Sequence, residues 1–117
     1  MKNQGFHKRL GFAVSGVVSA LRSEGSFRLH IVAALLVVAL LIVVRPDPLW
    51  WAVMALTIAC VLAAELFNTA IETLADHLHP QQHPHIKIVK DCAAGAVLLV
   101  SLGALGVAAA FVYAWLW

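Results

Sequence analysis

The chain has 117 residues, of which 62% are hydrophobic and only 12% are charged, with a formal net charge of +2 at pH 7. Its mean hydropathy of +0.90 lies well outside the usual balance of a soluble domain. These values exclude a water-soluble globular protein and indicate an all-α integral membrane protein.

The first predicted element is an amphipathic helix over residues 5–24. Its apolar side carries Phe6, Leu10, Val14, Val17 and Leu21, and its polar side carries Lys8, Ser15, Ser19 and Arg22. This pattern is typical of a helix that lies in the membrane interface. Gly25 and Ser26 then interrupt it, and we expect Ser26 to be the N-cap of the next helix. Glu24 is thereby placed at a bend near the level of the lipid headgroups.

Three segments are apolar enough to cross a membrane, which takes roughly 20 residues at about 1.5 Å per residue. They are residues 29–44, 49–67 and 92–117. The second helix is predicted to continue beyond the membrane, so the whole element spans 49–78. A loop over 79–90 and a last helix over 91–117 follow. These elements form a single predicted domain over 1–117.

The turn Arg45-Pro46-Asp47-Pro48 predicts that the first two spans form an antiparallel hairpin. Proline fixes its own φ angle and disfavours the helical conformation in the residue before it. In the third span, small residues between 93 and 110 permit close approach of helices. Three helices bury little by themselves, so we expect an oligomer.

The basic residues predict the orientation. Seven of them lie before the first span or between the second and third: Lys2, Lys8, Arg9, Arg22, Arg28, Lys87 and Lys90. This bias predicts a cytoplasmic N-terminus and a cytoplasmic second loop. The opposite, outer interface receives the aromatic residues Trp50, Trp51, Tyr113, Trp115 and Trp117, whose rings favour that position.

Residues 64–76 read AELFNTAIETLAD and contain three of the six acidic residues of the chain. With Glu65 at zero and about 100° per residue, Asn68 falls near 300°, Glu72 near 340° and Asp76 near 20°. A charge inside a span costs on the order of 3 kcal/mol, so Glu65 indicates a functional site. The alternatives are solvated residues for Glu72 and Asp76, a packing carboxylate for Glu65, and an interhelical hydrogen bond for Asn68.

A carboxylate-rich stripe at a membrane surface suits a phosphate-handling site. Mg²⁺ takes one or two carboxylates together with phosphate oxygens, and a more buried carboxylate can serve as a general base. The sequence contains no GxxxxGK[ST] motif and no kinase-type Gly-rich loop. A nucleotide would therefore have to be held by the metal, Lys90 and the basic N-terminal helix.

Three motifs, E-G-S-F-R at 24–28, A-E-L-F-N-T-A-I-E-T-L-A-D at 64–76 and K-D-C-A-A-G-A-V-L-L at 90–99, resemble the bacterial diacylglycerol kinase and undecaprenol kinase family. The resemblance covers about residues 6–111. It implies a small homotrimeric enzyme of the bacterial inner membrane that transfers the γ-phosphoryl group of ATP to the hydroxyl of a membrane lipid alcohol, with Mg²⁺. It implies no nucleic-acid partner.

The resemblance also implies roles for individual residues. Glu65 matches the general base, with Asn68 beside it as a second catalytic candidate. Glu24 and Glu72 match the pair that holds the metal on the nucleotide phosphates. Lys90 and Asp91 match nucleotide-contacting positions.

Further positions complete the expected site. Phe12 falls where the family often has an aromatic residue and is expected near the nucleotide, although burial in the interface would also explain it. The expected neighbours of the lipid substrate, besides Glu65, are Phe27, Arg28 and Ala94. Gly5 departs from the family pattern, because some members have an arginine there.

The lipid and two other classes of function stay open. The motifs F-R-L-H at 27–30 and K-D-C-A-A-G-A-V-L at 90–98 favour the undecaprenol-type branch, because the diacylglycerol-type branch tends to have an acidic residue at the position of His30. A small transporter would place its acidic residues near the bilayer midplane, and a structural subunit would have little use for the acidic stripe. The histidines of 77–85 match no tight metal-ligand spacing and are expected in a solvated loop. The alternatives are that part of this loop contacts the edge of the nucleotide or that the histidines bind a transition metal.

Overall fold

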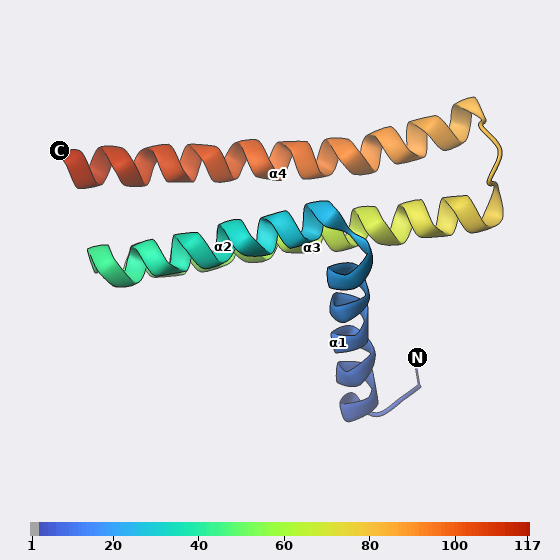
Figure 1. The fold of residues 1–117 in the computed structure, drawn as a ribbon, viewed down its shortest axis with the longest axis horizontal. Coiled ribbons are helices and arrows are strands. Elements are labelled where there is room, and N and C mark those ends of the chain that lie inside the picture. Colours follow the sequence, from blue (N-terminus) through green and yellow to red (C-terminus); the bar gives the residue numbers. More distant parts are fainter. Residues whose placement is uncertain (1–2) are drawn as a thin grey trace.

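The computed structural model describes residues 3–117, which fold into four helices with no strand. The helices are α1 (Phe6–Ser23), α2 (Gly25–Val44), α3 (Pro48–Leu78) and α4 (Pro84–Leu116). The last three run alongside one another, and α1 leaves them at a steep angle (Figure 1). α2, α3 and α4 are each long and apolar enough to cross a membrane. The predicted all-α membrane architecture is confirmed, while Lys2 lies outside the described residues.

The turn between α2 and α3 is three residues long and makes the two helices antiparallel. Arg45 ends α2 in the left-handed conformation, with φ 55° and ψ 58°, which is a common way for a helix to end just before a proline. Pro48 opens α3 at a position where its missing N–H costs nothing. We call the end of the bundle that carries this turn the aromatic end, because the C-terminal end of α4, with Tyr113 and Trp117, also lies there.

We call the opposite part of the bundle the basic end, because Arg22, Arg28, Lys87 and Lys90 belong to it. The α3–α4 loop lies at its tip, and α1 leaves the bundle where α2 begins (Figure 1). α3 has 31 residues and α4 has 33, whereas α2 has 20. At about 1.5 Å per residue, α3 and α4 extend beyond the start of α2 by roughly 15–20 Å. An α3–α4 hairpin therefore projects past the level of α1.

The loop at this end is shorter than the sequence predicted. Helix α4 begins at Pro84, so only 79–83 connect the helices and the rest of the expected 79–90 loop is helical. Proline is well suited to the first turn of a helix. In addition, the Nδ1 atom of His83 accepts a hydrogen bond from the backbone N–H of His85 at 3.1 Å, which satisfies one of the free donors of that turn.

The junction between α1 and α2 also differs from the expectation. The break falls at Glu24, with φ −112° and ψ 110°, and α2 begins at Gly25 without a side-chain cap. Ser26 is therefore not an N-cap but a residue of the first turn of α2. The Nη1 atom of Arg28 donates hydrogen bonds to the carbonyl oxygens of Leu21 and Arg22, at 3.0 and 3.1 Å. A cation thus closes the C-terminus of α1, where the helix dipole favours positive charge.

The main apolar cluster lies at the aromatic end. Leu41 of α2, Met54 of α3 and Phe111 of α4 are buried together, and the ring of Trp50 meets that of Phe111 edge-on at 5.2 Å between centroids. The glycines of α4 do not contribute to close packing within the chain. A Cβ atom added at Gly95, Gly103 or Gly106 would meet nothing within 4 Å. The expected close approach through these glycines is therefore absent inside this chain.

Candidate active site

Glu65 is the buried carboxylate of the structure, with 3% of its surface exposed. It lies on α3 opposite the first turns of α2. The Oγ atom of Ser26 donates to its Oε2 atom at 3.2 Å, and the Nδ1 atom of His30 lies 2.9 Å from its Oε1 atom. Ser26 and His30 are one helical turn apart on α2 and so face the same way. Both oxygens of the carboxylate are thereby contacted from one helix.

The contact with His30 is close but is not a well-aligned hydrogen bond. The ring nitrogen is shielded from solvent and has no hydrogen-bond partner among the described residues, although it lies within ion-pair distance of Glu65. The contact is therefore a close polar approach of the Nδ1 atom of His30 to the Oε1 atom of Glu65. Removing a carboxylate from water costs several kcal/mol. Polar contacts such as those with Ser26 and His30 offset that desolvation cost.

Asn68 follows Glu65 by about one turn on α3. Its Oδ1 atom is shielded from solvent and accepts no hydrogen bond within residues 3–117. A buried carbonyl oxygen without a donor costs about 1–3 kcal/mol. The carbonyl oxygen of Asn68 is therefore an acceptor that the described residues leave unused.

The outer carboxylates have different surroundings. Glu24 is half-buried at the junction of α1 and α2, and Glu72 is half-buried two turns beyond Glu65. Asp76 is exposed, and its Oδ1 atom lies 2.5 Å from the Nζ atom of Lys90 on α4. This pair joins the two helices of the projecting hairpin. It gives Asp76 an interhelical partner that the sequence did not reveal.

Lys90 and Asp91 were predicted to contact a nucleotide, and each has a partner within the chain. Both lie before the apolar run that begins at Cys92. The hydrogen bond to Asp76 raises the pKa of Lys90 above its usual value, with a smaller contribution from the charge of Glu72. Asp91 accepts a hydrogen bond from Lys87 at 2.6 Å, one turn earlier on α4. The ammonium group of Lys90 is therefore charged and held beside two carboxylates.

The donor set fits Mg²⁺ only together with phosphate. Within residues 3–117, no group of three or more His, Cys, Asp or Glu side chains could hold a metal ion. Glu24 and Glu72 offer two carboxylates, which is the number that Mg²⁺ commonly takes when phosphate oxygens complete its shell. The ring of His83 stacks on that of His85 at 5.3 Å between centroids and meets the ring of His79 edge-on at 5.4 Å. These described histidines also form no such group.

The residues expected near lipid and nucleotide are spread over the molecule. Phe27 is 1% exposed, so its ring lies inside the bundle, and a contact with lipid stays a prediction. Arg28 holds the end of α1, as described above. Ala94 is exposed on α4, and Phe12 is exposed on α1.

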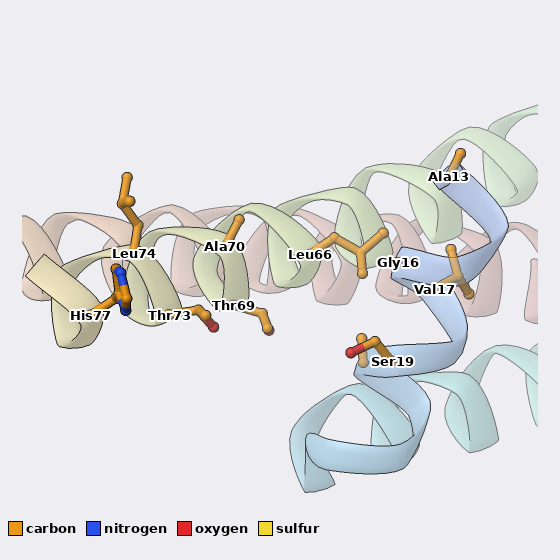
Figure 2. A pocket seen from close by; sticks show the side chains of 11 residues that line it. Ala13, Gly16, Val17, Ser19, Leu66, Thr69, Ala70, Thr73, Leu74 and His77 are labelled. Atoms are coloured by element: carbon orange, nitrogen blue, oxygen red, sulfur yellow. The ribbon is translucent and has the colours of Figure 1, made fainter. Parts of the chain in front are cut away.

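Two apolar cavities flank the acidic stripe. A notch of about 680 Å³ lies between α1 and α3. Figure 2 shows Leu66 close to Gly16 and Val17, with Thr69, Thr73 and His77 leading away from α1 along α3. None of the acidic residues lines this notch, so it is not the carboxylate site.

The second cavity is a crevice of about 400 Å³ between α2, α3 and α4. It runs along α2 from His30 to Leu41 and is lined mainly by small and aliphatic residues. Its end toward the basic end of the bundle is therefore formed by the histidine that contacts Glu65. Sequence reasoning missed Ser26 and His30 as partners of Glu65. The short turn at 45–47 indicates the level, because it places residues near 26 opposite residues near 66, but it does not give the rotation that brings Ser26 and His30 onto Glu65.

Comparison with known proteins gives consistent matches. The family model described as prokaryotic diacylglycerol kinase matches residues 11–112. A protein of Synechocystis sp. named diacylglycerol kinase is 38% identical over 94 residues, which cover 80% of this chain and 54% of that protein. A protein of Bacillus subtilis named undecaprenol kinase is 34% identical over 97 residues, which cover 83% of this chain and 79% of that protein. The chain thus spans about half the length of the first relative and most of the second.

Proposed function

The chain belongs to the prokaryotic diacylglycerol kinase family, and we propose that it is a kinase that transfers the γ-phosphoryl group of ATP to the hydroxyl of a membrane lipid alcohol. The observation that carries this proposal is the buried carboxylate of Glu65, contacted on both oxygens from α2. It lies near the level where the amphipathic helix α1 meets the bundle. A lipid hydroxyl at headgroup depth needs a base at that depth.

In this proposal Glu65 is the general base. Its carboxylate takes the proton from the lipid hydroxyl while that oxygen forms a bond to the γ-phosphorus, and the bond from the γ-phosphorus to the bridging oxygen of ATP breaks, so ADP leaves. Asn68 accepts a hydrogen bond from the substrate, which would satisfy its otherwise unpaired oxygen. Phosphoryl transfer requires mainly positioning and charge neutralisation, which a small helical bundle can supply.

The phosphates of ATP would lie beyond Glu65, toward the basic end. Glu24 and Glu72 would hold Mg²⁺, which neutralises phosphate charge when bound. Glu72 lies two turns, about 10 Å, from Glu65 along α3. Lys90 is close to this position and supplies a positive charge, and Asp91 and Phe12 are the further nucleotide contacts that we propose.

For the lipid we propose a polyprenol such as undecaprenol, with diacylglycerol as the alternative. The F-R-L-H motif at 27–30 supports the polyprenol. One relative is named diacylglycerol kinase and the other undecaprenol kinase, so the relatives do not distinguish the two lipids. Side-by-side phosphorylation of undecaprenol and diacylglycerol by the purified protein is the measurement that decides it.

We further propose that the protein is a homotrimer in the bacterial inner membrane with its basic end in the cytoplasm. The excess of Lys and Arg at that end supports the orientation. The open space at Gly95, Gly103 and Gly106 supports close contacts between chains, because small residues mark helix interfaces in membranes. A site shared between subunits would also supply donors for Asn68.

The test is Mg²⁺-dependent phosphorylation of a lipid alcohol by the purified protein in detergent or lipid. We expect transfer of phosphate from ATP to the lipid in the wild-type protein and its loss on chelation of the metal. A transporter or a structural subunit would consume no ATP in the presence of lipid alcohol. An inactive wild-type protein with both lipids would refute the proposal.

A further inference from the structure

The contact between α2 and the buried carboxylate has a consequence for catalysis. Glu65 on α3 is contacted by two side chains, Ser26 and His30, which lie one turn apart on α2. Ser26 donates through a hydroxyl at 3.2 Å, and the imidazole of His30 is the closer partner at 2.9 Å. α2 therefore controls the orientation of both carboxylate oxygens.

His30 occupies a particular position between the carboxylate and the apolar crevice. Its side chain is 27% exposed, whereas that of Glu65 is 5% exposed. The imidazole lines the end of the crevice and covers one oxygen of the carboxylate. A lipid chain in this crevice would bring its hydroxyl end to His30 and Glu65 together.

We propose that His30 is a positioning residue, which holds Glu65 in the orientation that accepts the proton of the lipid hydroxyl. This inference rests on the proposed kinase function. A base is effective only when its lone pair points at the proton within hydrogen-bond reach. For metal-ligating side chains, a partner that fixes their orientation typically contributes about 10–100-fold to activity, and we expect a similar factor for this carboxylate. His30 itself touches neither phosphate nor metal in this proposal.

Charged groups on the neighbouring elements do not replace this contact. The lysine nearest the stripe, Lys90, is bound to Asp76, and Arg28 is bound to the end of α1. Ser26 is neutral and contacts the other oxygen. Among the described residues, His30 is therefore the one side chain that contacts the Oε1 atom of Glu65.

The test compares two substitutions of the same residue. We expect His30→Leu to lower kcat for lipid phosphorylation by about 10–100-fold with little change in KM for ATP, because the nucleotide site is separate. His30→Asn should recover much of that loss, because its side-chain nitrogen can occupy the place of Nδ1. Ser26→Ala should cost less than His30→Leu. His7→Leu, which removes an exposed imidazole from α1, is the matched control with unchanged rate.

A double mutant separates positioning from a general structural effect. In the Glu65→Gln background, His30→Leu should cause no further loss of the residual rate, since it acts through the carboxylate. A wild-type rate for His30→Leu, an equal loss for His30→Asn, or a full further loss in the Glu65→Gln background would each overturn the proposal. An inactive wild-type protein would instead refute the kinase function itself. These two failures are therefore distinct.

Discussion

Replacing Glu65 by glutamine is the sharpest test of the proposed chemistry. The substitution keeps the shape of a residue that is 3% exposed, and its amide oxygen can still accept the hydrogen bond from Ser26. The amide cannot take up a proton at neutral pH. The change therefore removes the base and leaves the packing of α2 against α3 nearly intact.

The expected loss follows from the role of the carboxylate. A positioned general base contributes about 10²–10⁴-fold, so kcat should fall by that factor, which corresponds to roughly 3–5 kcal/mol in the barrier. Nucleotide affinity should persist, because Glu72 and Lys90 lie about two turns further along the bundle. Unfolding in detergent should change little, since no cavity and no unpaired charge is created.

The assay measures initial rates of lipid phosphorylation, nucleotide binding and thermal unfolding on the same preparation. A near-normal rate for Glu65→Gln would show that Glu65 is not the base. A large loss of thermal stability with an unchanged rate per folded molecule would instead indicate a packing carboxylate. Either result refutes the reasoning.

Three further predictions concern the surrounding residues. Glu72→Gln should raise the Mg²⁺ concentration needed for half-maximal activity severalfold while kcat at saturating metal is largely kept; an unchanged metal titration would contradict its role as a ligand. Asp76→Asn breaks the contact with Lys90. The side chain of Asp76 is 61% exposed and that of Lys90 is 35% exposed, so the unfolding free energy should change by less than about 1 kcal/mol. A larger change in the denaturation midpoint would mean that the pair is shielded in the assembly. Arg28→Gln should weaken the closure of α1 by about 0.3–1 kcal/mol, seen as faster hydrogen exchange in its last turn; unchanged protection there would argue against the cap.

Much of the architecture could be predicted from local sequence patterns. Hydropathy and length identified the three spanning helices, the amphipathic pattern identified α1, and the prolines at 46 and 48 identified the hairpin turn. The errors fell where local signals compete. The sequence pattern predicts Pro84 in a loop, whereas this residue begins α4. It predicts Ser26 as a cap, whereas the Ser26 hydroxyl donates a hydrogen bond to Glu65.

The candidate site was predictable only in part. The stripe of Glu65, Asn68 and Glu72 follows from the helical period alone, and the structure keeps these residues on one helix. Their partners do not follow from that period. Asp76 was the residue without an assigned role, and its contact with Lys90 joins two helices across 14 positions of the sequence.

The sequence by itself determined that this is a membrane protein of the prokaryotic diacylglycerol kinase family, which helices span, and which acidic residues share one face. The spans and the shared acidic face depend on the hydropathy and the period of a single helix, whereas the family rests on the sequence motifs. Only the tertiary structure decided that Ser26 and His30 contact Glu65 and that Lys90 contacts Asp76. The reason is physical: such contacts depend on the rotation and register of two helices against each other, which their mutual packing sets.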